Sequence, residues 1–412
     1  MSTVGVVVEY NPLHNGHLYH LQQSRKITGA DAVVAVMSGD FLQRGEPAMA
    51  DKWARAEMAL LAGCDVVLEL PVAYSAQPAQ WFAHGAVATL DATGVVDSLC
   101  FGSESGDIEA LDAMAAMLTE EPVPFAAGLG ERLKQGLPYP TAFTAAAQAY
   151  LRERGLERLA FALEQPNHTL GLHYLIALRK LGSRIVPYSV RREKSEYGQS
   201  DITDARIASA TALRKLLLGE GGAIETLAPY VPETTLDVLR REIEAGRAPI
   251  RWDSFARPLF HELYRHDAAA LGEYAEVTEG LEHRIRAALA ELRELSVEAL
   301  LETLKTKRYT RTKLQRTLTR ILLGHPKVML TPERLASGVK YVRVLGFTER
   351  GRKLLGRMRR EAKVAVVDSA ARGDWPYLAL DARAAATYAL AFRDAAPADA
   401  LLDYTKPPIR LR

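Results

Sequence analysis

Two histidines stand three residues apart, directly after the first apolar run of the sequence, in the segment His14-Asn-Gly-His17. Residues three apart face the same side of a helical turn, so both rings can point toward one ligand. Their ring nitrogens can donate hydrogen bonds to a triphosphate as charge builds during an in-line attack at the α-phosphate. Asn11 and Pro12 predict a preceding turn, and Gly16 lets the backbone approach a ligand closely. The pattern therefore predicts a nucleotide site with His14 and His17 as catalytic residues.

Two other interpretations of these histidines stay open. Together with His20 they are spaced by threes, which would suit a metal site. A metal would require a further carboxylate or histidine close in sequence, and none stands out, so no metal ligand is predicted. The pair can also be two histidines at a helix end without a chemical role. Their position between a strand, a turn and a helix favours nucleotide binding over both alternatives.

A second segment rich in hydroxyl groups, Ser209-Ala-Thr211-Ala-Leu-Arg214, follows the last strand predicted in the first half and opens a helix. Hydroxyls and an arginine at a helix start form a surface suited to phosphate. An ordinary helix N-cap would explain Ser209 equally well if the segment stood alone. Because the histidine segment lies at the other end of the same predicted sheet, the two are expected to form a phosphate clamp. Ser209 and Thr211 are accordingly further candidate catalytic residues.

Short apolar runs alternate with amphipathic helices through the first half of the chain. This alternation predicts an α/β fold, with a parallel sheet covered by helices on both faces. Strands are predicted at Val4–Glu9, Ala32–Met37, Asp65–Leu70, Ser98–Phe101 and Arg184–Val190. Helices are predicted at His17–Lys26, Lys52–Leu61, Gln80–Leu90, Ile108–Met117, Thr169–Leu181 and Ala210–Leu218. Such sheets bind ligands at the carboxyl ends of their strands, where the histidine segment begins.

A glycine cluster from Gly219 to Gly222, followed by Pro229 and Pro232, marks the predicted domain boundary. Residues 1–225 would form the nucleotide-binding catalytic domain and residues 226–412 a second, mainly α-helical domain. The second half is mostly 3.6-periodic, with short strands possible only at Tyr341–Leu345 and Val364–Val367. A chain of 412 residues is too long for one ordinary core, which also favours two domains.

Composition describes an ordinary globular protein, with 48% hydrophobic and 25% charged residues. The two cysteines, Cys64 and Cys100, lie in apolar surroundings without metal-ligand spacing, so they are expected to be reduced thiols in the core. No segment approaches the roughly 18 apolar residues that a membrane helix needs. The N-terminus lacks the pattern of a secretory signal. A cytoplasmic protein is therefore predicted.

Positive charge concentrates in the second half, although the net charge of the chain is only +2. Seven basic residues and one acid lie between Leu301 and Arg320, and a second basic cluster runs from Arg350 to Lys363. Tyr309 lies among the cations of the first cluster, a combination suited to phosphate contacts and base stacking. A charge run is more often a solvated face. Because the cluster lacks acids to pair with its cations, RNA binding is favoured, through Lys305, Lys307, Arg308, Arg311, Lys313 and Arg316.

Several segments resemble one family in particular. The histidine segment and Ser209–Arg214 are similar to the two signatures of the HIGH nucleotidyltransferases, whose catalytic domain is Rossmann-like. The whole chain is more closely similar to the tRNA(Met) cytidine acetate ligases of that superfamily. The segments that carry this resemblance are Val6–His20, Met37–Pro47, Lys52–Arg55, Phe101–Glu104, Lys307–Thr310 and Leu314–Arg316.

The resemblance implies an enzyme that converts acetate and ATP to acetyl-adenylate and pyrophosphate. It would then transfer the acetyl group to the exocyclic amine of the wobble cytidine in elongator tRNA(Met), with Mg²⁺ expected to accompany ATP. By the same resemblance, Gly102, Asn167 and Arg192 contact ATP. So does the stretch from Val7 to His20, namely Val7, Val8, Glu9, Tyr10, Asn11, Pro12, Leu13, His14, Asn15, Gly16, His17, Leu18, Tyr19 and His20.

Some details depart from the family pattern or leave alternatives open. Asp40 stands where a neutral side chain or histidine is expected, which puts a direct role for that position in doubt. Arg191 precedes Arg192, so either guanidinium can be the one that faces the nucleotide. Arg44 can grip phosphate or pair with Glu46. A small-molecule adenylyltransferase with a helical domain for oligomerisation is the alternative function, and a catalytically inactive RNA-binding protein is a third.

Overall fold

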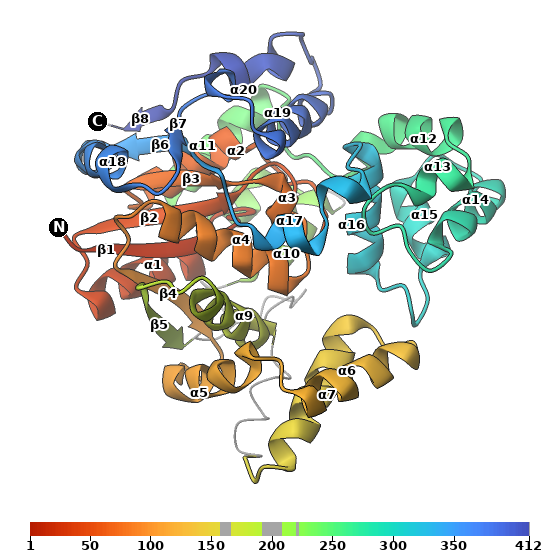
Figure 1. Ribbon diagram of the computed structural model, residues 1–412. Helices are drawn as coiled ribbons and strands as arrows, with labels where there is room; N and C mark the ends of the chain where they lie inside the picture. Colours follow the sequence, from red (N-terminus) through yellow and green to blue (C-terminus); the bar gives the residue numbers. More distant parts are fainter. Residues whose placement is uncertain (157–165, 192–207, 220–221, 412) are drawn as a thin grey trace.

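A single eight-stranded sheet runs through the computed structural model, which describes residues 1–156, 166–191, 208–219 and 222–411 (Figure 1). Its strand order is β5-β4-β1-β2-β3-β6-β7, with β8 paired to β6. Neighbouring strands are parallel except β3 and β6, which are antiparallel. The strands are β1 Thr3–Val8, β2 Ala32–Ser38, β3 Val66–Leu70, β4 Ser98–Ser103, β5 Val186–Arg191, β6 Tyr341–Thr348, β7 Ala365–Val367 and β8 Ile409–Leu411.

Side chains of the central strands alternate between the two faces of the sheet, as the two-residue period of a strand requires. Val4, Val6 and Val8 of β1 pack in the core on one face, whereas Val34 and Val36 of β2 pack on the other. The first face is covered by α1 Asn15–Thr28, α2 Lys52–Leu61, α10 Ala210–Leu218 and α11 Glu233–Glu244. The second is covered by α4 Ala79–Ala92, α5 Ile108–Thr119, α9 Pro166–Lys180 and α18 Glu349–Glu361.

The predicted α/β fold class is confirmed. All five strands predicted in the first half are present and mutually parallel, and every helix predicted there is found within a few residues of its expected bounds. A helical hairpin, α6 Val123–Lys134 and α7 Tyr139–Arg152, is not among the predicted elements, and it projects from the sheet beside α5 (Figure 1). Cys64 and Cys100 are free and buried, as expected. Among the described residues, no helix is both long and apolar enough to cross a membrane.

The second half of the chain contributes to two different parts of the fold. A helical lobe stands to one side of the sheet in Figure 1. It comprises α12 Ala256–Arg265, α13 Ala268–Gly272, α14 Leu281–Glu291, α15 Val297–Leu304 and α16 Arg311–Leu322. The chain then returns to the sheet through α17 Pro332–Ala336, β6, α18, β7, α19 Pro376–Ala389, α20 Leu402–Thr405 and β8.

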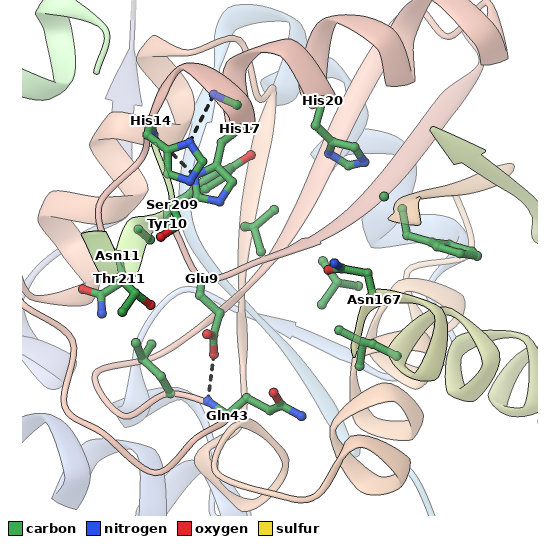
Figure 2. A pocket seen from close by; sticks show the side chains of 18 of the residues that line it. Glu9, Tyr10, Asn11, His14, His17, His20, Gln43, Asn167, Ser209 and Thr211 are labelled. Carbon is green, nitrogen blue, oxygen red and sulfur yellow. Dashed lines mark hydrogen bonds between the residues drawn. The ribbon is translucent and has the colours of Figure 1, made fainter. Parts of the chain in front are cut away.

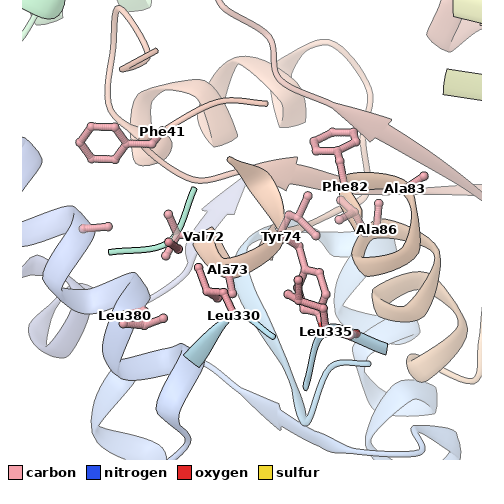
Figure 3. Close-up of a cluster of buried hydrophobic side chains, with 14 of the residues drawn as sticks. Phe41, Val72, Ala73, Tyr74, Phe82, Ala83, Ala86, Leu330, Leu335 and Leu380 are labelled. Carbon is pink, nitrogen blue, oxygen red and sulfur yellow. The ribbon is translucent and has the colours of Figure 1, made fainter. Parts of the chain in front are cut away.

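The strands expected in the second half are thus present, but they extend the N-terminal sheet. The core likewise crosses the predicted boundary: Val72 and Tyr74 of α3 (Val72–Ser75) lie in one cluster with Leu330, Leu335 and Leu380 (Figure 3). A division at residue 225 would therefore cut through one continuous sheet, because β1–β5 precede it and β6–β8 follow it. The assignment of residues 226–412 to a separate domain stays a prediction.

Four buried charges hold these C-terminal strands onto the sheet. Lys52 Nζ donates to Glu69 Oε1 and to Asp403 Oδ2, each at 2.7 Å. Arg343 of β6 donates from Nη1 to the same Asp403 oxygen at 2.9 Å, and its Nε lies 3.6 Å from Glu69 Oε2. The four side chains are at most 3% exposed. Because the two acids outweigh the effect of burial, the pKa of Lys52 is raised.

Removing one charge from this network should be costly, since it leaves the remaining buried charges unbalanced. We expect Asp403→Asn to lower the free energy of unfolding by about 3–5 kcal/mol. Urea unfolding measures the change. Glu349→Gln serves as the control, because the Glu349–Arg352 pair is exposed and such pairs contribute about 0–1 kcal/mol. Equal effects of the two substitutions would contradict this role for the network.

Candidate active site

A cavity opens where β1 and β4 end, between the start of α1, the loop after β2 and the start of α10 (Figure 2). The structure brings most of the predicted site residues together there. The cavity is lined by Ser209 and Thr211 of the second segment, and by Val7, Val8, Glu9, Tyr10, Asn11, His14, Gly16, His17, Tyr19, His20, Gly102 and Asn167.

Four residues of the predicted stretch, Pro12, Leu13, Asn15 and Leu18, do not line the cavity. Leu13 is fully buried in the core beneath α1. Asn15 instead anchors the start of α1, since its N–H donates to the Tyr230 carbonyl at 2.8 Å. Arg192 lies outside the described residues, whereas the neighbouring Arg191 lines the cavity.

His14 and His17 cap the first turn of α1 reciprocally. His14 Nδ1 accepts a hydrogen bond from the N–H of Gly16 at 3.1 Å, and His17 Nδ1 accepts from the N–H of His14 at 3.3 Å. The two rings stack with centroids 3.6 Å apart. A ring nitrogen that accepts a hydrogen bond carries no proton, so each neutral ring has its N–H at Nε2. The cap thus fixes both histidines as Nε2–H donors, as binding to developing negative charge requires.

The second predicted segment lies at the start of α10, beside the histidine segment in the same cavity (Figure 2). Ser209 accepts a hydrogen bond from the N–H of Ala212 at 3.1 Å and is therefore an N-cap. Arg214 donates to the Asn11 carbonyl at 2.8 Å and to Glu46 Oε1 at 3.0 Å. Ser209 is therefore both an N-cap and a cavity residue. Arg214 connects this segment to the loop that carries the histidines.

The far side of the cavity is built by β4 and α9. Asn167 donates from Nδ2 to Glu104 Oε1 at 2.7 Å, and the N–H of His168 donates to Glu104 Oε2 at 2.9 Å. Glu104 therefore caps α9 and holds Asn167, which lines the cavity together with Gly102.

The loop after β2 forms a wall of the cavity through Leu42, Gln43, Arg44 and Glu46. The N–H of Gln43 donates to Glu9 Oε1 at 2.7 Å, which joins this loop to the end of β1. Arg44 is indicated by the sequence, whereas Leu42 and Gln43 are not predicted as cavity residues. Their position after strand β2, at the ligand-binding edge of the sheet, is the signal that could identify them.

Helix α16 of the helical lobe supports this same loop from behind. The hydroxyl of Thr319 donates to the Gly45 carbonyl. Gly45 has a φ of +79°, and a Cβ at this position would lie 2.3 Å from the backbone nitrogen of Arg316. Only glycine allows so close an approach at this φ. The lobe and the cavity wall are therefore in direct contact.

Asp40 has a structural role in place of the direct role that was in doubt. Its Oδ1 accepts a hydrogen bond from the N–H of Lys52 at 2.7 Å, at the start of α2, and the side chain is 5% exposed. Burial raises its pKa to about 7, although the nearby Lys52 lowers it. Asp40 does not line the cavity.

The structure corrects one assumption behind the predicted RNA-binding cations, namely that no acids are available to pair with them. Acids approach most of these cations, and several come from outside the cluster. Arg311 binds both oxygens of Glu298 at 2.6 Å, Arg308 binds Glu279 at 2.9 Å, and Arg316 binds Glu276 at 2.9 Å. Lys305 lies 3.7 Å from Glu302 and Lys313 lies 3.9 Å from Glu279.

Lys307 differs from the other cations of this cluster. It is exposed, and no acid of the described chain forms an ion pair with it. Tyr309 is only 8% exposed, and its hydroxyl donates to the Glu279 carbonyl at 2.6 Å. It is therefore a core residue of the lobe and not an exposed stacking platform. RNA binding by the six cations stays a prediction.

Comparisons with known proteins agree on one family. The profile of the family described as HIGH Nucleotidyl Transferase matches residues 1–401. The tRNA(Met) cytidine acetate ligase of Acetivibrio thermocellus is 40% identical over 369 residues, covering 89% of this chain and 88% of the relative. That of Lysinibacillus sphaericus is 39% identical over 411 residues, with full coverage of both chains.

The chain belongs to the tRNA(Met) cytidine acetate ligase family. Two crystal structures of Thermotoga maritima TmcAL match the fold with complete coverage of both chains. The apo structure gives a TM-score of 0.93 at 37% identity. The structure bound with alpha-thio ATP gives a TM-score of 0.91 at 36% identity. The nucleotide site predicted from the histidine segment is thus consistent with a family in which one member has been crystallised with alpha-thio ATP.

The contact between α16 and the cavity wall can be tested by removing one hydroxyl. We expect Thr319→Val to weaken ATP binding by up to about tenfold, because the Gly45 carbonyl would lose its donor and the wall one of its anchors. Isothermal titration calorimetry measures the dissociation constant. Thr317→Val is the matched control: Thr317 is equally buried, but its hydroxyl bonds the Lys313 carbonyl at 3.0 Å and the Glu276 carbonyl at 3.4 Å, and neither residue lines the cavity. Equal affinities for the two variants would refute a positioning role for Thr319.

Proposed function

We propose that this protein is an ATP-dependent ligase that acetylates the wobble cytidine of elongator tRNA(Met), giving N4-acetylcytidine. The observation that carries the proposal is the joining of the two predicted phosphate-binding segments in one cavity. This cavity belongs to a chain similar over its full length to tRNA(Met) cytidine acetate ligases. ATP, acetate and the tRNA are its substrates, and the reaction belongs to the cytoplasm, where these three meet.

The first step is the activation of acetate. A carboxylate is a poor acyl donor, so its oxygen attacks the α-phosphate of ATP to form acetyl-adenylate, and pyrophosphate leaves. His14 and His17 would donate from Nε2 to the phosphate oxygens as charge moves onto them. The N-termini of α1 and α10, where His14 and Ser209 lie, add the positive ends of two helix dipoles. Thr211 lies beside them in the cavity.

Mg²⁺ would accompany the nucleotide. Within the described residues, no group of three or more histidine, cysteine or acidic side chains could hold a metal ion. This fits an ion carried mainly by the phosphates and water, which is how Mg²⁺ commonly binds with nucleotides. The ion would neutralise phosphate charge when bound, and the protein groups would orient the chain of phosphates.

The second step transfers the acetyl group to the tRNA. The exocyclic amine of cytosine is conjugated with its ring and is weakly nucleophilic, so it requires a donor as reactive as an adenylate. An anticodon loop can present an unstacked base to a cavity, which is how sequence-specific RNA recognition commonly works. The proposal assigns the RNA contacts to the helical lobe through Lys305, Lys307, Arg308, Arg311, Lys313 and Arg316.

Incubation with ATP, labelled acetate and total tRNA, followed by nucleoside analysis, tests the function. We expect labelled N4-acetylcytidine only when ATP and acetate are both present. His14→Ala and His17→Ala should each lower acetate-dependent pyrophosphate exchange by about 100- to 1000-fold, because each removes one preorganised donor. Unchanged thermal unfolding would show that both variants stay folded. Acetylation from acetyl-CoA without ATP, or near-wild-type exchange in either variant, would refute the mechanism.

The RNA-binding role of the lobe is tested by changing charge in both directions. Neutralising Lys305, Lys307, Arg308 and Arg311 together should weaken tRNA binding and flatten its salt dependence, by about one unit of slope for each RNA phosphate that these cations bind in the wild type. Pyrophosphate exchange should stay nearly unchanged. The control replaces Glu279, Glu298 and Glu302 with glutamine, which removes the acids paired with Arg308 and Arg311 and should strengthen tRNA binding. Filter binding at several salt concentrations measures both, and unchanged affinity in both variants would place the RNA surface elsewhere.

A further inference from the structure

Glu9 is an acidic side chain inside a cavity that has to accept a triphosphate. It follows the last residue of β1, and its carboxylate projects into the cavity toward Gln43 (Figure 2). A negative group there repels phosphate, so phosphate binding does not explain it. The side chain is only partly buried and lines the cavity, so a substrate group can reach it.

The orientation of this carboxylate is fixed on one side only. Oε1 accepts hydrogen bonds from the N–H of Gln43 at 2.7 Å and from the hydroxyl of Ser38 at 3.1 Å. No lysine or arginine of the described chain forms an ion pair with it. The nearby guanidinium of Arg55 binds the Glu9 main-chain carbonyl at 2.8 Å and not the carboxylate. Glu9 is therefore a held carboxylate without a neutralising partner among the described residues, and its natural complement is an N–H donor of a substrate.

We propose that Glu9 is the general base that removes the proton from the exocyclic amine of the cytidine during acetyl transfer. This inference rests on the proposed function. The amine nitrogen attacks the carbonyl carbon of acetyl-adenylate, forming the C–N bond. The bond from that carbon to the phosphate oxygen breaks, and AMP leaves with the electron pair. The amine proton passes to the carboxylate of Glu9, so the products are the acetylated base, AMP and a protonated Glu9 that then releases its proton to water.

The surroundings of Glu9 suit this task. Burial is the largest influence and raises its pKa above 4.5, and the neighbouring Glu46 raises it further. The Gln43 N–H, the Ser38 hydroxyl and the positive charge of Arg55 each lower the pKa and limit this rise. A general base works best when its pKa lies close to the working pH while it is still largely ionised.

Glu9→Gln tests the proposal, because the amide oxygen can still accept the hydrogen bonds of Gln43 and Ser38 while the base is removed. Pyrophosphate exchange by the same variant measures any lost contact with the nucleotide, and transfer should fall much further than exchange does. Transfer from preformed acetyl-adenylate to tRNA, followed in single turnovers, should slow by about 100- to 10,000-fold. In the wild type, transfer should fall as the pH drops through the pKa of Glu9. Ser38→Ala removes a hydrogen bond that lowers this pKa, so the fall should move to higher pH.

Asp40→Asn is the matched control, since Asp40 is a second buried acid with a raised pKa that lies outside the cavity. It should keep the pH dependence of transfer. The proposal is overturned if Glu9→Gln slows exchange and transfer equally, which would make Glu9 a nucleotide contact. It is also overturned if Glu9→Gln leaves transfer unchanged, or if Asp40→Asn abolishes the pH dependence. Failure of the wild type to acetylate tRNA at all would instead refute the proposed function.

Discussion

Charges removed from water are tolerated only when each meets its opposite, and in this protein Lys52, Glu69, Arg343 and Asp403 meet in one buried network. They come from α2, β3, β6 and α20, so the network forms only when both ends of the chain have folded together. Its desolvation cost makes partial assembly unfavourable. The buried network therefore links β6, which joins the parallel sheet in the antiparallel direction, to helix α2, which begins at Lys52.

The same helix carries this constraint to the active site. One turn after Lys52, Arg55 is fully buried and donates to the carbonyls of Glu9, Ser38, Gly39 and Ala50. These carbonyls belong to the ends of β1 and β2 and to the loop that follows β2. One guanidinium thus satisfies backbone acceptors from the segments that form the cavity, which would otherwise be buried without donors. Helix α2 therefore contributes Lys52 to the buried charge network and Arg55 to the support of the cavity walls.

The sequence predicts the parts of the fold in which local pattern and final structure coincide. The five parallel strands and the histidine segment are local, and both lie where the sequence places them. Long-range pairing is not visible in the sequence. The apolar run at Tyr341 predicts a strand but not its partner β3, and the cluster around Arg311 shows no sign of the acids that reach it from other segments. Its position among cations suggests that Tyr309 is an exposed stacking residue, whereas in the structure it packs in the core of the lobe.

The ion pairs of these cations weaken the argument that the basic helix alone indicates RNA binding. An RNA phosphate that binds Arg308 or Arg311 must compete with an internal carboxylate, so each contact contributes less than a free arginine would. Charge alone then no longer separates a tRNA enzyme from a small-molecule adenylyltransferase, and the family likeness decides between them. Geometry adds a second argument. From Arg311 to Thr319 the helix axis spans about 12 Å, at 1.5 Å per residue. RNA held at the start of α16 would therefore lie about two helical turns from the residue that supports the wall of the nucleotide cavity.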